Sequence, residues 1–146
     1  PSPGKEVTAV SDMKCPFSMV QASGASACSK AQEVIRRGGS EYDCTDPDAH
    51  PLCTDLVAHL NAVALPALGH EDDLTLTPRS VYERVLLGGL QGLRRAADPG
   101  DDAPETPDIW AVVAAARERY PDFPSIPAED FVPAVEACQV RKRRRR

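Results

Sequence analysis

The chain has 146 residues, of which 42% are hydrophobic and 27% are charged. These values are typical of one folded domain spanning residues 1–146, and they exclude an intrinsically disordered chain. No run of apolar residues is long enough to cross a bilayer, and residues 1–10 lack the apolar stretch of a secretory signal. The expected location is therefore the cytoplasm, with an organelle as the alternative.

The charge is distributed unevenly along the chain. The net charge is −5, with 17 Lys and Arg against 22 Asp and Glu. Six of the basic residues form the C-terminus, Arg141, Lys142, Arg143, Arg144, Arg145 and Arg146. The acidic remainder would repel nucleic acid, so we expect at most weak nucleic-acid contact through this tail. The tail is predicted to bind a protein partner; the alternative is a solvated tail or one that folds back onto acidic residues 101–102.

The N-terminal quarter is predicted to be an arm followed by a helix. Residues 1–25 contain Pro, Ser and Gly with few periodic apolar positions, which indicates a loop. Residues 26–37 carry apolar side chains at helical spacing and end at Gly38-Gly39, a pair that stops helices. Residues 40–50 are predicted to be a turn.

The remainder is predicted to be helical, because Pro at helix starts and Gly or Pro at helix ends delimit amphipathic runs. The expected helices are 51–65, 77–97, 106–120 and 127–140, the last one kinked or restarted at Pro133. The predicted fold class is therefore all-α, with four to five short helices in an irregular bundle. Residues 1–53 would form an arm and a Cys-rich cofactor segment, 54–140 the helical core, and 141–146 the basic tail.

Four of the five cysteines lie within the first third of the chain. They are Cys15, Cys28, Cys44 and Cys53, separated by twelve, fifteen and eight residues. On the predicted elements, Cys28 and Cys53 fall in the first turns of two helices, and the other two lie in the irregular segments before them. Backbone N–H groups at helix N-termini stabilise anions, so the four thiolates are predicted to meet there and bind one cofactor.

An iron–sulfur cluster is the favoured cofactor, with a 4Fe-4S cluster first. Such clusters take four Cys thiolates, and Cys15-Pro16 resembles a common ligand context in ferredoxins. The spacing matches no ferredoxin pattern, and it lacks the paired C-x2-C of structural zinc sites. Zinc, for which His50 is a weaker candidate ligand, two disulfides, or no cofactor therefore stay open as alternatives.

The expected role is electron transfer, redox sensing, or service as an accessory subunit of a redox enzyme. The alternative is a disulfide- or zinc-stapled helical subunit of a larger assembly. No catalytic constellation is recognisable, so the chain is not predicted to be an enzyme. Cys138 is predicted to be a buried structural thiol, and Gly88, Gly89 and Gly92 are expected to allow close helix packing.

Overall fold

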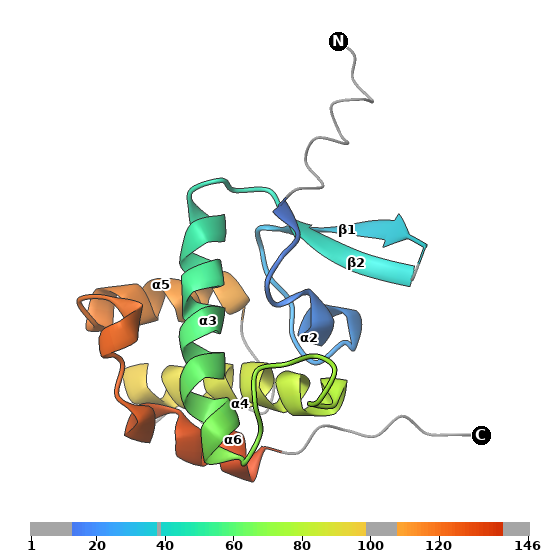
Figure 1. The fold of residues 1–146 in the computed structure, drawn as a ribbon. Helices are drawn as coiled ribbons and strands as arrows, with labels where there is room; N and C mark the ends of the chain where they lie inside the picture. Colours follow the sequence, from blue (N-terminus) through green and yellow to red (C-terminus); the bar gives the residue numbers. More distant parts are fainter. Residues whose placement is uncertain (1–12, 38, 99–107, 139–146) are drawn as a thin grey trace.

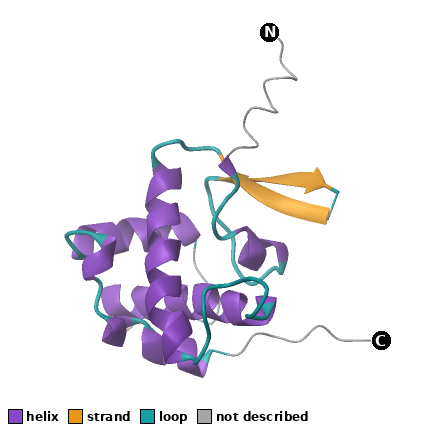
Figure 2. Cartoon of the chain, in the orientation of Figure 1, coloured by secondary structure: helices purple, strands orange, loops and turns teal. Residues whose placement is uncertain are grey.

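The computed structural model describes residues 13–37, 39–98 and 108–138 (Figure 1). This part of the chain is mostly helical, with one small antiparallel sheet (Figure 2). Its elements are α2 (Ser18–Ala22), β1 (Ala31–Arg36), β2 (Gly39–Cys44), α3 (Ala49–Ala67), α4 (Arg79–Ala97), α5 (Ile109–Arg119) and α6 (Val132–Ala137). Two short 3-10 turns, Phe123–Ser125 and Ala128–Asp130, join α5 to α6.

The prediction of a purely all-α fold is wrong, because residues 31–44 form a β-hairpin. A helix was expected over 26–37 and a turn over 40–50, yet β1 pairs antiparallel with β2 in these segments. The β-branched residues Val34 and Ile35 favour an extended strand. Gly39 has φ of +116°, a conformation that side-chain-bearing residues rarely adopt. Gly39, one of the two glycines that were interpreted as a helix stop, therefore begins β2 of a hairpin.

The predicted N-terminal loop also contains a helix. Its described part holds α2, a single short helix whose neighbour Phe17 is fully buried. α2 packs against β2 and α4, so the segment before the hairpin is attached to the helical body. The five residues of α2 are too few to give a periodic signal, which explains why the sequence did not predict it.

The predicted central helices are confirmed. α3 and α4 extend over 49–67 and 79–97, close to the predicted 51–65 and 77–97. α5 begins at 109 and not near 106, because Asp108 is its N-cap and accepts a hydrogen bond from Ala111 N. None of the helices in these described ranges combines the length and the apolar character that crossing a membrane requires.

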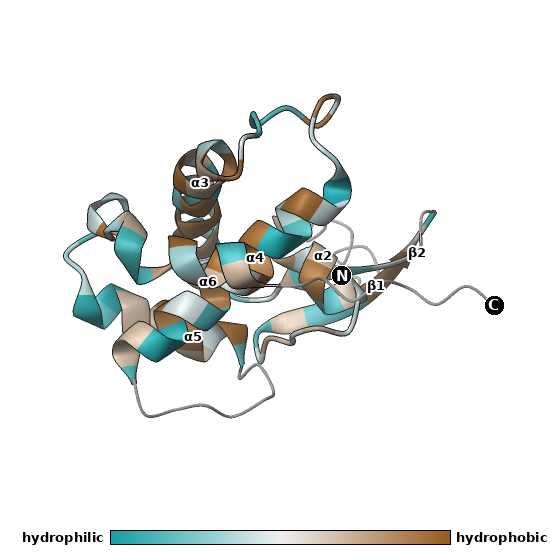
Figure 3. Ribbon diagram, turned by 90° about the horizontal axis from the view of Figure 1, so that it is seen from below, coloured by the Kyte–Doolittle hydropathy of each residue, from teal (hydrophilic) through white to brown (hydrophobic). Residues whose placement is uncertain are grey.

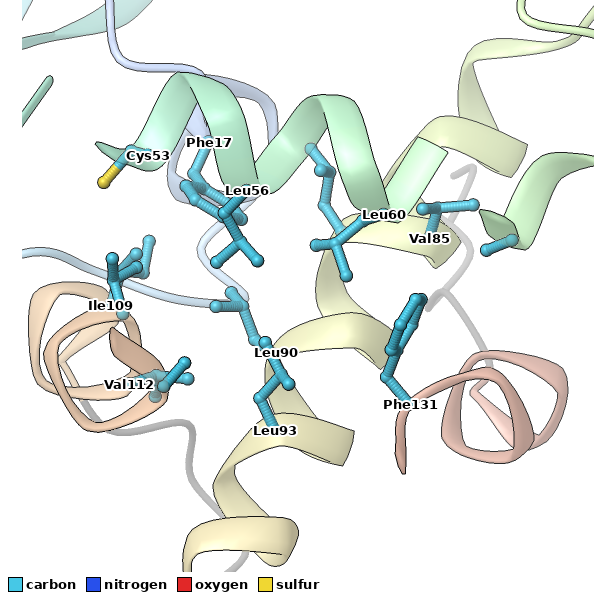
Figure 4. Packing of buried hydrophobic residues seen from close by; sticks show 14 of the residues in the cluster. Phe17, Cys53, Leu56, Leu60, Val85, Leu90, Leu93, Ile109, Val112 and Phe131 are labelled. Atoms are coloured by element: carbon cyan, nitrogen blue, oxygen red, sulfur yellow. The ribbon is translucent and has the colours of Figure 1, made fainter. Parts of the chain in front are cut away.

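The hydrophobic core lies between α3, α4, α5 and α6 (Figures 1 and 4). Its fully buried side chains include Leu56 and Leu60 from α3, Val85 and Leu90 from α4, Ile109 and Val113 from α5, and Phe131 and Val135 near α6. α3 is hydrophobic along much of its length, whereas the hairpin ends in hydrophilic residues (Figure 3). The core is thus helical, and the hairpin projects from it.

Close packing at the α4 glycines is also confirmed. A methyl group at Gly88 would lie 2.5 Å from Val135 Cα, and one at Gly92 would lie 2.7 Å from Phe131 Cα. Both positions face the backbone of the last helical segment, where no side chain would fit.

The last helix is interrupted near the predicted restart at Pro133. The chain forms a 3-10 turn over Ala128–Asp130 and then enters α6 at Val132. Cys138, at the end of α6, is 8% exposed, in agreement with the expected buried thiol. The acidic loop at 100–106, the basic tail at 141–146 and the first twelve residues lie outside the described residues.

Candidate metal centre

The structure brings the four clustered cysteines to one pocket. Cys15, Cys28, Cys44 and Cys53 all line it, together with Lys30 and Trp110. Each thiol comes from a different segment: the stretch before α2, the turn before β1, the end of β2, and the second turn of α3. Cys28 is therefore not in a helix and Cys44 is not in an irregular segment, contrary to the sequence-based expectation.

The hairpin register places Cys28 and Cys44 together. Cys44 is the last residue of β2 and lies opposite Ala31 in β1. Ala31 N donates to Cys28 O over 3.1 Å, which closes a turn just before the strand. On the other side, Thr45 N donates to Lys30 O over 2.8 Å. Antiparallel pairing thus joins two cysteines that are sixteen positions apart in the chain.

Cys15 reaches the pocket along the opposite edge of β2. Lys14 forms an isolated antiparallel bridge with Asp43, and Cys15 N donates to Tyr42 O over 2.8 Å. Cys53 completes the set from α3; its sulfur lies at one end of the row of core side chains, near Ile109 (Figure 4). The pocket is therefore at the junction between the hairpin and the helical body.

Three of the four sulfurs accept a backbone hydrogen bond from the residue two positions later. The donors are Phe17 N to Cys15 Sγ at 3.4 Å, Lys30 N to Cys28 Sγ at 3.5 Å, and Asp46 N to Cys44 Sγ at 3.5 Å. Amide hydrogen bonds to sulfur stabilise the thiolate, which is the metal-binding form. At each of these three cysteines a backbone N–H therefore points at the sulfur.

The start of α5 also faces Cys28. The backbone N–H of Trp110 donates to the Cys28 thiol, which favours its ionised form. Asp108 holds the two segments together, because its carboxylate accepts from Ser29 N and from Ser29 Oγ, the latter at 2.9 Å. Cys28 thus lies at a helix N-terminus, as predicted, but the helix is α5 and not one that contains Cys28.

Burial opposes ionisation of these thiols. Loss of hydration raises the pKa of Cys15 to about 11 and that of Cys53 to about 12, and it also raises the pKa of Cys28. Charge on the other cysteines raises all three pKa values further, which shows that the four sulfurs are electrostatically coupled. Without a cation, burial therefore holds the thiols of Cys15, Cys28 and Cys53 in the neutral form.

Lys30 and Trp110 form the outer wall of the pocket, and both are half-buried. Lys30 Nζ lies 2.8 Å from Asp46 Oδ2 and 5.3 Å from the centre of the Trp110 ring. Sequence reasoning singled out neither residue as part of this site. No sequence signal marks either residue, because the contact depends on the hairpin meeting α5.

The pairing of the thiols and the size of the pocket limit the cofactors that the four cysteines could hold. All five cysteines are free, so the structure does not pair them as disulfides. Over residues 13–37, 39–98 and 108–138, no group of three or more His, Cys, Asp or Glu side chains is arranged to hold a metal ion. The space between the walls is about 10 Å³, room for about one water molecule. The donor set of four sulfurs suits soft metals.

The other predicted ligands lie elsewhere. His50 Nε2 lies 3.1 Å from Lys14 O, and His50 does not line the pocket. His59, which does not line the pocket either, has its Nε2 3.0 Å from Ile126 O and its ring against Phe131. The tail residues predicted to bind a partner fall outside the described residues.

Comparison with models of protein families, with curated proteins and with solved structures finds no match for this chain. The interpretation of the pocket therefore depends on its own residues.

Proposed function

We propose that Cys15, Cys28, Cys44 and Cys53 hold an iron–sulfur cluster, and that the protein acts in electron transfer, in redox sensing or as an accessory subunit of a redox enzyme. The observation that supports this most is that four free thiols from four separate segments line one pocket. Outside this pocket the chain has a single further cysteine, Cys138, which is not a lining residue.

A cluster agrees with the way in which the sulfurs share the pocket. A single zinc ion needs four sulfurs about 2.3 Å from one point. The described side chains form no such group, although all four cysteines line one pocket. In a cluster each thiolate binds a different iron atom, so the sulfurs surround the cofactor without converging on one point.

The surroundings also agree with a redox cofactor. A cluster held by four thiolates carries net negative charge and supplies one-electron chemistry when bound. Three backbone N–H groups donate to the sulfurs, and the ammonium group of Lys30 lies on the same wall. Such donors and cations offset the negative charge and make reduction more favourable.

A structural zinc ion is the second candidate, because the space between the thiols is small. At about 10 Å³ it is closer to the size of one ion than to that of a cluster. Zinc would link the hairpin to α3 and α5 without redox activity, and the protein would then be a stapled subunit of a larger assembly. The basic tail, Arg141–Arg146, would in either case provide the contact with a protein partner through its charge.

The test is metal and sulfide analysis of protein purified without oxygen, together with single Cys→Ser variants. We expect iron and acid-labile sulfide in the wild type, and loss of both, with the visible colour, in Cys15→Ser, Cys28→Ser, Cys44→Ser and Cys53→Ser. Cys138→Ser is the matched control, since this thiol is buried away from the pocket. It should retain the cofactor in full.

Each outcome has a distinct meaning. Zinc without sulfide, lost in the same four variants, would establish the second candidate and retire the redox role. The third outcome is a purified protein that contains neither iron nor zinc and takes up no iron or sulfide on reconstitution. This outcome would refute cofactor binding altogether.

A further inference from the structure

Gln21 carries a buried side-chain amide that contacts a sulfur of the cysteine pocket. Its Nε2 donates to Cys15 Sγ over 3.2 Å, and the residue is only 5% exposed. The donors to the sulfurs of Cys28 and Cys44 described above are backbone N–H groups, which every residue except proline carries. The contact at Cys15 depends instead on the identity of one side chain, so it is specific to the residue at position 21.

The fold fixes the position of this amide. Gln21 lies in α2, and its backbone N–H donates to Phe17 O over 3.2 Å. Phe17 is fully buried and donates its own N–H to Cys15 Sγ over 3.4 Å. α2 packs against β2 and α4, which holds this turn in place. Two N–H groups, one from the backbone and one from a side chain, therefore reach the same sulfur from a single turn of the chain.

An amide in this position distinguishes the two ionisation states of the sulfur. A polar group that is removed from water needs a hydrogen-bond partner to offset its lost hydration. A neutral thiol is a weak acceptor, whereas a hydrogen bond to an ionised acceptor is roughly twice as strong as one between neutral groups. The Gln21 amide thus stabilises the thiolate of Cys15 more than the thiol. The thiolate is the form that binds metals.

The same reasoning applies to reduction of a cofactor held by thiolates. An added electron makes the cofactor and its sulfurs more negative, and hydrogen bonds to these sulfurs then become stronger. A donor to sulfur therefore favours the reduced state and raises the reduction potential. Residues that hydrogen-bond to a metal ligand also support binding itself, because their substitution typically lowers metal affinity by about 10- to 100-fold.

We propose that Gln21 is a positioning residue of the cysteine site, whose amide N–H holds Cys15 as the thiolate that binds the metal. With a redox cofactor in the pocket, the same hydrogen bond raises the reduction potential. This inference rests on the proposed function, since it requires that Cys15 bind a metal. It extends that function to a residue that is not a ligand and does not line the pocket.

Two variants of Gln21 test the proposal in the purified holoprotein. Gln21→Leu and Gln21→Met both keep a side chain of similar volume, and both remove the N–H groups that donate to sulfur. We expect each to have a lower reduction potential than the wild type in a redox titration followed by visible absorbance. For a one-electron couple, a tenfold change in the equilibrium constant of reduction corresponds to a shift of about 59 mV.

Ser18→Ala is the matched control. Ser18 also lies in α2 and is also 5% exposed, but its Oγ accepts a hydrogen bond from Tyr42 N over 3.0 Å. Its removal loosens α2 against β2 and leaves both donors to Cys15 in place. This variant should lose stability in chemical denaturation and keep the reduction potential of the wild type. Circular dichroism of all three variants shows whether the hairpin and helices are intact.

The affinity for zinc is the second measurement, and it applies if the protein is found to contain zinc without sulfide. Competition with a chromophoric chelator should then show binding weakened by about tenfold in Gln21→Leu and Gln21→Met, and unchanged in Ser18→Ala. That result would support the role of Gln21 at Cys15, although the redox part of the proposed function would be refuted.

Two results would overturn this inference while leaving the proposed function intact. One is a reduction potential, or a zinc affinity, that is the same in both Gln21 variants as in the wild type. The other is an equally large change in Ser18→Ala, which would assign the effect to the packing of α2. A wild-type protein that takes up neither iron nor zinc would instead overturn the proposed function, and this inference with it.

Discussion

At the residue scale, burial and hydrogen bonding act in opposite directions on the thiol of Cys15, whereas every influence on the thiol of Cys53 raises its pKa. Burial raises the pKa of both, so that the neutral thiol is favoured. Hydrogen bonds from Phe17 N and Gln21 Nε2 to Cys15 favour the thiolate. A bound metal resolves this conflict, because its positive charge replaces the lost hydration of each sulfur. Burial therefore keeps these two thiols neutral unless a cation lies beside them.

This balance predicts a pH dependence of the metal-free protein. The pKa of Cys15 and that of Cys53 rise from 9.0 to about 11 and about 12 on folding, so the folded state retains protons that the unfolded state releases. The stability contributed by the neutral thiols is complete below pH 9 and is lost as the pH rises towards those values. Urea midpoints measured under reducing conditions at increasing pH should therefore fall above pH 9.

The control for this prediction is the Cys15→Ser/Cys53→Ser variant. Burial also raises the pKa values of Tyr82 and Tyr120, so these residues lower stability at high pH in the same direction. Comparison with the variant therefore isolates the part of the pH dependence that comes from the two thiols. Its midpoint should fall less steeply with pH than that of the wild type. Equal slopes would mean that the two thiols are not buried as described.

At the scale of elements, α4 is the helix against which the C-terminal segment packs. Gly88 and Gly92 lie one turn apart and face the backbone at Val135 and Phe131. Arg84, one turn before Gly88, donates from Nε to Val135 O over 3.0 Å. The absence of side chains at two glycines thus allows α6 to approach α4 closely, at a cost of about 1 kcal/mol of helix propensity at each.

Alanine substitutions in α4 should therefore differ by position. Gly88→Ala and Gly92→Ala place a methyl group against backbone that cannot move aside, and overpacking of this kind typically costs about 1–3 kcal/mol. Gly89→Ala is the matched control, because its methyl group would meet Leu60 Cδ1, the end of a flexible side chain, at 2.9 Å. Chemical denaturation should show a clear decrease in the free energy of unfolding for Gly88→Ala and Gly92→Ala, and a smaller change for Gly89→Ala. Equal effects at all three would contradict the close approach of α6.

At the scale of the whole molecule, the cysteine pocket lies where the hairpin meets the helical body. Its walls come from the segment before α2, from both ends of the hairpin, from α3 and from α5. The hairpin itself extends away from the helices (Figure 1). A bound cofactor would therefore act as a cross-link between the hairpin and the helical core.

Removal of the cofactor is consequently expected to lower global stability. A ligand that binds only the folded state stabilises it by about 2.7 kcal/mol at a hundredfold excess over its dissociation constant. Calorimetry of protein before and after cofactor removal should show a lower melting temperature for the stripped protein. The Cys28→Ser variant, treated identically, should show the same melting temperature before and after the treatment. A stripped protein that melts at the same temperature would indicate that the pocket does not cross-link the fold.

Part of this fold could be predicted from the sequence. α3 and α4 carry apolar residues at helical spacing over nineteen positions each, and Pro and Gly mark their flanks, so their type and approximate limits follow from local chemistry. The hairpin could not be predicted in the same way. Residues 26–37 satisfy a helical pattern, and only pairing with residues 39–44 makes the extended form more favourable.

The sequence by itself determined that four thiols lie close together along the chain and that a helical core follows them. The tertiary structure alone decided how the thiols meet. Strand pairing joins Cys28 to Cys44, the edge of β2 positions Cys15, and α3 supplies Cys53. It also decided that α5 and Lys30 face the pocket. The physical reason is that residue type sets local propensity and metal preference, whereas proximity between distant segments arises from hydrogen-bond registers and shared burial, which no local pattern encodes.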